Sequence, residues 1–479
     1  MSTLAERPST PTRNPLLELK AHGQSTWLDY IRRSLITSGE LKRLVEEDGL
    51  SGLTSNPTIF DKAIAGSSDY DEQLQRLLAG NPKMSPTALF DAIEIADIQA
   101  TADVLRPVYD RTEGADGFVS IEVSPGLARD TAGSIAEARR LWQAVNRPNL
   151  LIKIPATPEG IPAILTLIAE GINVNITLMF SLAHYEAVAN AYISGLERNF
   201  QPQRVASVAS FFVSRVDTAV DKELEKAGTP EALALRGAIA VANSKLVYQR
   251  FREIFSSDRW KALARRGARL QRVLWASTGT KNPAYSDILY VDSLIGPDTV
   301  NTMPPATLQA FRDHGTVRET VTEGVDQARA AIERLGKLGV DLNVITEKLQ
   351  EEGVRAFSES MDKLLESLEG RRCSIVASHV DPQTLSLGSF EKPVEERLSA
   401  WQRGSFTRRL WARDYTLWSA KPVAELTDRM GWLTLPETMH EQVPALQAFA
   451  DRVRDESFRH VVLLGMGGSS LAPEVFQRT

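Results

Sequence analysis

Short apolar segments alternate with amphipathic stretches along the chain up to about residue 370. Eight such segments precede a change in composition, and most of them are followed by a helical pattern. The segments are Thr26–Ile31, Gly49–Thr54, Phe118–Val123, Leu150–Pro155, Ile172–Thr177, Val205–Phe211, Arg272–Ala276 and Ile288–Val291. Eightfold strand–helix alternation predicts an α/β fold built as a parallel (β/α)8 barrel, or TIM barrel.

The stretches between these segments are predicted to be helices that cover the barrel. Examples are Ser134–Val145, Pro158–Ala169, Ser181–Leu196 and Pro230–Phe255. We expect the barrel domain to span residues 16–370 and to close with helices around Val317–Leu335 and Asp341–Leu368. Residues 1–15 are polar and rich in Pro, Ser and Thr, which predicts a flexible tail and not a signal peptide.

The segment Leu150–Pro155 carries one lysine among apolar branched residues. A strand that is apolar on both faces is typical of a parallel sheet covered by helices, so we expect Lys153 to be buried. Desolvation lowers the pKa of an amine, and a neutral amine can attack a carbonyl to form a Schiff base. The alternative is a strand-end lysine whose head reaches solvent.

Polar side chains stand at the ends of the predicted strands, where a (β/α)8 barrel places its active site. They are Asp29, Asn56, Glu122, Lys153, Asn175, Thr177, Ser210 and Ser277. Each has a structural alternative: an Asn-Pro turn, an ion pair, or a Ser or Thr that caps the next helix. Their convergence on one mouth nevertheless indicates a site.

The residue types at this mouth suit carbonyl chemistry on a sugar phosphate. Glu122 and Asp29 can move the protons that Schiff-base formation and C–C cleavage require. Arg215 and Lys281 can hold a phosphate, as loops after the late strands of such barrels often do. The alternatives are an exposed ion pair of Arg215 with Asp217 and a solvated loop lysine at Lys281.

Composition narrows the classes of protein. The 479 residues are 43% hydrophobic and 24% charged with a net charge of −6, which gives no general attraction to nucleic acid or anionic membranes. The sequence contains no run of about 18 apolar residues, so no membrane span is predicted. Cys373 is the single cysteine, so no internal disulfide can form and a cytoplasmic location is expected. The six histidines are scattered, and we predict no metal site.

Five blocks in order along the chain resemble the transaldolases. They are Leu53–Phe60, Ser120–Ser124, Leu151–Pro155, Asn173–Ser181 and Trp275–Asn282. The resemblance implies a cofactor-free class I enzyme of the pentose phosphate pathway. Such an enzyme moves a dihydroxyacetone unit from sedoheptulose 7-phosphate to glyceraldehyde 3-phosphate, giving erythrose 4-phosphate and fructose 6-phosphate.

The resemblance also implies roles for individual residues. Lys153 forms the Schiff base, Glu122 works with a water on proton transfers, and Asp29 handles the C4-hydroxyl proton. The implied substrate-binding residues are Asn56, Asn175, Thr177, Ser210, Arg215, Ser277 and Lys281. Family members usually carry an arginine at the position of Lys281, and lysine lacks the bidentate fork of arginine.

The composition changes after about Arg372. The stretch Gln383–Trp432 carries four tryptophans and is predicted to be largely helical. The segment Phe458–Ala472 reads as an apolar strand that runs into a glycine-rich turn and a helix start. Such a turn can bind phosphate, and the alternative is a tight strand–helix turn without a ligand.

The segment Phe458–Ala472 resembles the opening of glucose-6-phosphate isomerase and its sugar-isomerase (SIS-like) domain. The sequence stops at Thr479, before the glutamate base and the histidine of that family. We therefore expect residues 371–479 to be an incomplete, isomerase-like α/β segment fused to the barrel, without isomerase activity.

Three other functions remain open at this point. An aldolase of the same family would hydrolyse the intermediate and release dihydroxyacetone, although the small aldolases carry a tyrosine where Glu122 stands. A sugar-phosphate isomerase or binding module would rest on Gly465–Ser470. A non-catalytic barrel would require Lys153 to be inert.

Overall fold

The computed structural model describes residues 14–380, 386–456, 458, 460 and 462. The chain divides into two compact units, Met1–Pro382 and Gln383–Thr479. The division predicted at residue 370 falls inside helix α17 (Leu342–Val380). Among the described residues, no helix is both long and apolar enough to cross a membrane.

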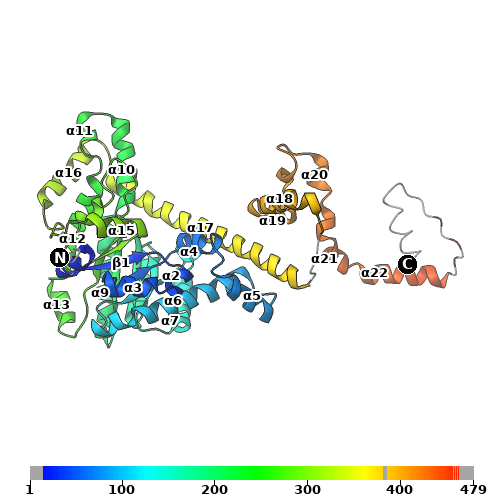
Figure 1. Cartoon of the computed structure of the whole chain (residues 1–479), viewed down its shortest axis with the longest axis horizontal. Coiled ribbons are helices and arrows are strands. Elements are labelled where there is room, and N and C mark those ends of the chain that lie inside the picture. Colours follow the sequence, from blue (N-terminus) through cyan, green and yellow to red (C-terminus); the bar gives the residue numbers. More distant parts are fainter. Residues whose placement is uncertain (1–13, 381–385, 457, 459, 461, 463–479) are drawn as a thin grey trace, which may run out of the picture. The chain divides into compact units, whose positions relative to one another are not determined.

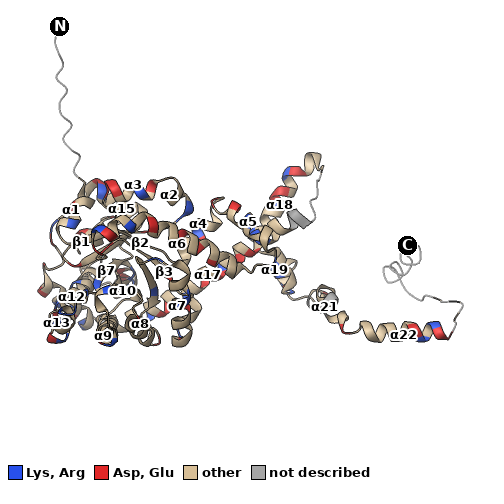
Figure 2. Ribbon diagram, turned by 90° about the horizontal axis from the view of Figure 1, so that it is seen from below, with Lys and Arg blue, Asp and Glu red and all other residues tan. Residues whose placement is uncertain are grey.

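The first unit is a closed barrel of eight parallel strands, each paired with the next, and β8 paired with β1 (Figure 1). The strands are β1 (Gln24–Asp29), β2 (Gly52–Thr54), β3 (Phe118–Glu122), β4 (Leu150–Pro155), β5 (Val174–Met179), β6 (Ser207–Phe212), β7 (Arg272–Ala276) and β8 (Thr299–Met303). Figure 2 shows the strands enclosed by a ring of helices with charged residues on them. The predicted (β/α)8 architecture is confirmed.

The eighth predicted strand was wrong. Residues Ile288–Val291 lie at helix α14 (Leu289–Asp292), and the true last strand is β8. Tyr290 on α14 is buried and donates a hydrogen bond to Asp217 Oδ2 at 3.0 Å. Strand β8 was missed because it is rich in polar residues. These residues are buried, and partners inside the barrel can satisfy their hydrogen bonds; Asn301, for example, accepts a hydrogen bond from Thr278 at 2.9 Å.

The helices of the first unit cover the barrel and begin with α1, which starts at the last residue of the predicted tail, Pro15. Asn14 Oδ1 caps this helix by accepting from the Leu16 N–H at 3.1 Å. The helices are α1 (Pro15–Ala21), α2 (Arg33–Thr37), α3 (Glu40–Glu47), α4 (Pro57–Ala65), α5 (Asp71–Gly80), α6 (Pro86–Arg111), α7 (Thr131–Val145), α8 (Gly160–Ala169), α9 (Leu182–Arg198), α10 (Ser214–Ala227), α11 (Pro230–Leu233), α12 (Ile239–Ile254), α13 (Asp258–Ala264), α14, α15 (Pro305–His314), α16 (Val325–Lys337) and α17, with 3-10 turns η1 (Pro125–Leu127) and η2 (Pro202–Arg204).

The stretch Pro230–Phe255, predicted as one helix, is broken into α11 and α12. Gly237, just before α12, has a φ of 69°, a left-handed conformation that glycine adopts without strain. Asp221 accepts from the Gly237 N–H at 3.1 Å, and Asp217 accepts from the Ala240 N–H at 2.7 Å. These two carboxylates on α10 satisfy the backbone where the helix is interrupted.

The described regular elements of the second unit are α-helices and 3-10 helices, joined by turns and irregular segments. Its elements are η3 (Gly388–Phe390), α18 (Glu391–Arg403), α19 (Phe406–Trp411), η4 (Tyr415–Leu417), α20 (Ala424–Asp428), η5 (Gly431–Thr434), α21 (Leu435–His440) and α22 (Val443–Asp455). Trp401 stacks on Phe406 with ring centroids 4.7 Å apart. Of the predicted strand and turn at Phe458–Ala472, only Phe458, His460 and Val462 are described, and none of these is in a strand. Gly465–Ser470 lies outside the described residues.

Candidate active site

Lys153 and Glu122 form a buried ion pair inside the barrel. They are register partners on neighbouring strands β4 and β3, so both side chains point the same way. Lys153 Nζ lies 3.1 Å from Glu122 Oε2 and donates to the Ser55 carbonyl at 3.1 Å. The two residues are 4% and 8% exposed, respectively. The lysine therefore does not reach bulk solvent, and the alternative of a strand-end lysine with a solvated head is not observed.

Burial governs the two carboxylates of the site. It raises the pKa of Glu122 above its ordinary value, against the opposing charge of Lys153. It also raises the pKa of Asp29, against the Lys153 charge and a hydrogen bond from Thr54 Oγ1 at 2.7 Å. A raised pKa brings a carboxyl group closer to the neutral range, where it can both accept and donate a proton.

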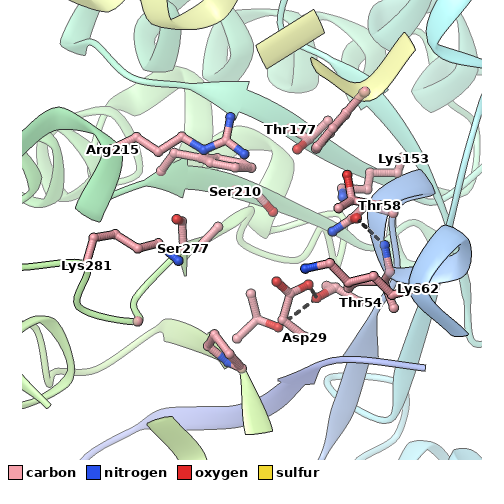
Figure 3. A pocket seen from close by; sticks show the side chains of 18 residues that line it. Asp29, Thr54, Thr58, Lys62, Lys153, Thr177, Ser210, Arg215, Ser277 and Lys281 are labelled. Atoms are coloured by element: carbon pink, nitrogen blue, oxygen red, sulfur yellow. Dashed lines mark hydrogen bonds between the residues drawn. The ribbon is translucent and has the colours of Figure 1, made fainter. Parts of the chain in front are cut away.

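A pocket opens above this pair at the carboxyl ends of the strands (Figure 3). Eight of the ten predicted site residues line it: Asp29, Asn56, Lys153, Thr177, Ser210, Arg215, Ser277 and Lys281. Glu122 and Asn175 are not among the residues that line it. Glu122 is the ion-pair partner of Lys153, and Asn175 is fully buried beside Lys153 as its register partner on β5.

Asn175 belongs to a buried hydrogen-bond chain across three strands. Ser210 Oγ donates to Asn175 Oδ1 at 2.6 Å, and Asn175 Nδ2 donates to Ser120 Oγ at 2.9 Å. Thr177 is also fully buried, yet its hydroxyl has no hydrogen-bond partner among the described residues. A buried hydroxyl that lines a pocket in this state is available to a water or a substrate hydroxyl.

Asn56 both caps a helix, which was its structural alternative, and lines the pocket, as its predicted role in the site requires. Its Oδ1 caps α4 by accepting from the Ile59 N–H at 3.0 Å, as a helix-capping asparagine does. The residue also lines the pocket. The cap fixes the side chain and leaves the amide nitrogen as the group that can contact a ligand.

Two cationic residues, Arg215 and Lys281, lie with Ser277 on one side of the pocket, away from Lys153 (Figure 3). The Arg215 guanidinium lies over the Phe212 ring, 5.4 Å from its centroid, and burial lowers the pKa of Arg215. The alternative ion pair with Asp217 is not formed, because that carboxylate binds Ala240 and Tyr290 instead. Lys281 is exposed at the rim, and its charge is one of those that lower the pKa of Asp29.

Ser277 holds this side of the pocket in shape. It has a φ of 56°, a strained conformation for a residue with a Cβ atom. Its hydroxyl lies 3.0 Å from that of Ser214, and its carbonyl accepts from the Ser214 N–H at 3.1 Å. These bonds fix the strained turn beside Arg215.

The pocket also contains residues that the sequence analysis did not select. They are Thr54, Thr58, Ile59, Lys62, Phe212, Ala276, Gly279, Thr302, Pro304 and Phe357. Thr54, Thr58 and Lys62 lie in or beside the block Leu53–Phe60, so their closeness to Asn56 was a usable signal. Phe357 is on α17, about 200 residues from Lys153, and no local pattern marks it. Among the described residues, no group of three or more His, Cys, Asp or Glu side chains is arranged to hold a metal ion.

The closed parallel barrel and its buried lysine–carboxylate pair define the class of protein, a (β/α)8-barrel enzyme. The family model described as Transaldolase/Fructose-6-phosphate aldolase matches residues 26–368. The transaldolase of Parafrankia sp. (strain EAN1pec) is 51% identical over 359 residues, which cover 74% of this chain and 97% of the relative. That of Thermobifida fusca (strain YX) is 51% identical over 358 residues, with the same coverage of both chains.

A protein named Transaldolase 2 from Nostoc sp. is 46% identical over 374 residues, covering 75% of this chain and 97% of the relative. The chain belongs to the transaldolase/fructose-6-phosphate aldolase family. The residues matched by the family model all lie within the first compact unit.

Proposed function

We propose that the protein is a transaldolase that transfers a dihydroxyacetone unit from sedoheptulose 7-phosphate to glyceraldehyde 3-phosphate. The observation that carries the proposal is the buried Lys153–Glu122 pair, 3.1 Å apart, whose lysine lines a pocket together with Asp29. The names and identities of the relatives support it. The products are erythrose 4-phosphate and fructose 6-phosphate, so the reaction is one of the pentose phosphate pathway. We expect the enzyme to be cytoplasmic.

The proposed mechanism begins with the ketose carbonyl. Lys153 Nζ adds to the carbonyl carbon, and Glu122, acting through a water, transfers the protons that convert the carbinolamine into an iminium ion. Asp29 then accepts the proton of the C4 hydroxyl as the C3–C4 bond breaks and the aldose leaves. The iminium ion takes up the electron pair of this bond, so the reaction needs no metal or organic cofactor.

The other predicted site residues bind the sugar phosphate in this proposal. Asn56, Asn175, Thr177 and Ser210 hold the hydroxyl groups of the three-carbon unit. Arg215, Ser277 and Lys281 hold the phosphate at the other side of the pocket (Figure 3). Cations are suited to this task because a charge-assisted hydrogen bond to phosphate is stronger than a hydrogen bond between neutral groups.

The test is borohydride trapping with fructose 6-phosphate followed by peptide mass spectrometry. We expect a reduced three-carbon adduct on Lys153 in the wild type and none in Lys153→Arg. An adduct on another lysine, or no adduct on the folded protein, contradicts the mechanism. Turnover that proceeds equally without an aldose acceptor would instead identify an aldolase.

We further propose that the second unit carries a sugar-isomerase-like segment fused to the barrel. The support is the glycine-rich segment Gly465–Ser470 in the sequence and the separation of the chain into two units. An acceptor-free isomerisation assay with fructose 6-phosphate tests whether this unit is catalytic, and formation of glucose 6-phosphate would identify an isomerase.

A further inference from the structure

Helix α17 crosses the mouth of the barrel with one regular face. Gln350, Gly353, Phe357 and Ser360 are spaced by three, four and three residues, which places them on one side of a helix. Gln350 and Phe357 are 5% and 4% exposed, whereas Glu351 and Arg355 between them are exposed. We call the four residues the roof face.

The roof face is fixed to the barrel on both sides of Phe357. Gln350 Nε2 donates to the carbonyls of Ala156 and Leu178, at 3.0 Å each, beyond β4 and within β5. The Ser360 hydroxyl lies 2.8 Å from that of Thr58 on α4. Both tethers lie at the carboxyl ends of the strands, so the roof is anchored around the pocket itself.

Gly353 allows this close approach. A Cβ at this position would lie 2.8 Å from Leu178 Cδ2 and 3.7 Å from Arg215 Nη1. Glycine in a helix interior costs about 1 kcal/mol relative to alanine, so its presence here suits a contact that a side chain would prevent.

Phe357 brings the roof to the reacting nitrogen. The ring lines the pocket, and its centroid lies 5.7 Å from Lys153 Nζ, within the range of a cation–π interaction. An iminium ion on Lys153 carries a positive charge at this nitrogen. The ring therefore faces the charge with its negative π surface and fills space next to it that water could otherwise occupy.

We propose that Phe357 covers the imine on Lys153 and so directs the bound three-carbon unit to an aldose rather than to release. This inference rests on the proposed transaldolase function and deepens it. In transfer, the carbanionic carbon bonds to the aldose carbonyl carbon, whose oxygen takes up a proton. In release, the same carbon takes a proton from water before an aldose arrives.

Both routes then end alike. One water adds to the imine carbon and the C–N bond breaks, which restores the Lys153 amine and frees a ketose or dihydroxyacetone. The routes differ in the proton that reaches the carbanion. An apolar ring over the imine keeps proton-donating water from that carbon and leaves the aldose as the available partner.

The test uses the full chain with fructose 6-phosphate and erythrose 4-phosphate. The measured quantity is the ratio of free dihydroxyacetone to sedoheptulose 7-phosphate. We expect this ratio to rise about tenfold in Phe357→Ala and roughly two- to fivefold in Phe357→Leu, which keeps apolar bulk but presents no π surface to the cation. Val344→Ala, at an exposed position of the same helix, is the control and leaves the ratio unchanged.

The ratio does not depend on how much of a preparation is folded, because both products come from the same active molecules. If Phe357→Ala does not fold, the product ratio measured for Phe357→Leu tests the inference. An unchanged ratio in Phe357→Leu, or an equal rise in Val344→Ala, overturns the inference. Failure of the proposed function is seen separately, as the absence of a trapped adduct on Lys153 in the wild type.

Discussion

Lys153 Nζ and Glu122 Oε2 lie 3.1 Å apart as register partners on adjacent strands. A covalent bond to a substrate carbonyl would remove the lysine charge or move it onto an imine without taking Glu122 out of reach. In the proposed mechanism this closeness lets nucleophilic attack by Lys153 and proton transfer by Glu122 take place within one buried space. This relationship underlies the first prediction.

Replacing Glu122 by Gln keeps the shape of the side chain but removes its ability to carry a proton. We expect kcat to fall by about 10²- to 10⁴-fold, the usual contribution of a general acid–base group. Steady-state transfer assays measure the effect. Glu94→Gln is the matched control, since Glu94 is also a buried glutamate, whose pKa burial raises well above its ordinary value, and it does not line the pocket. Equal losses in both variants would contradict a specific role for Glu122.

The proposed phosphate-binding side of the pocket predicts an asymmetry between its two cations, Arg215 and Lys281. Arg215→Ala should raise KM for fructose 6-phosphate by roughly 10- to 150-fold, the value of a hydrogen bond to a charged group. Lys281→Arg should lower KM, because arginine binds phosphate with two donors. Lys42→Ala removes one charge outside the pocket and serves as control. If unphosphorylated fructose responds equally to Arg215→Ala, the arginine does not bind the phosphate.

The two hydrogen bonds of Gln350 predict a stability effect. Gln350→Leu removes the donor to the Ala156 and Leu178 carbonyls, and each loss should cost about 1–3 kcal/mol of the free energy of unfolding. Urea unfolding of both proteins measures the difference. Glu351→Leu, at the neighbouring exposed position, should stay within about 0.5 kcal/mol of wild type. A similarly small change for Gln350→Leu would show that the tether contributes little.

Asp217 predicts a pH dependence of stability. Burial raises the pKa of this carboxyl to about 6, so the folded state holds the proton more tightly than the unfolded chain. Its contribution is fully present below about pH 4 and is lost as pH rises through about 6, by about 3 kcal/mol in total. Asp217→Asn should remove this part of the slope.

Urea unfolding of wild type and variant at several pH values between about 4 and 8 measures that slope. Asp326→Asn, at an exposed position, is the control. Parallel stability curves for wild type and Asp217→Asn would mean that Asp217 does not bind its proton more tightly in the folded state.

Seven of the predicted segments overlap barrel strands. The clearest is β4, whose apolar residues are interrupted only by Lys153, as is typical of a buried parallel strand. Strand β8 could not be predicted, since Thr299, Asn301 and Thr302 are polar and their burial depends on partners from other strands. The apolar run Ile288–Val291 misled for the converse reason. Four apolar residues fit a buried helical turn as well as a strand, and only packing separates the two.

The sequence by itself determined the barrel and the positions of Lys153, Glu122 and Asp29 near the strand ends, because strand polarity and alternation are local properties of the chain. The tertiary structure alone decided which groups meet. It paired Lys153 with Glu122, turned Asp217 away from Arg215, and brought Phe357 of α17 to within 5.7 Å of the lysine nitrogen. Such contacts join residues far apart in the chain, and their distances depend on how every intervening element packs.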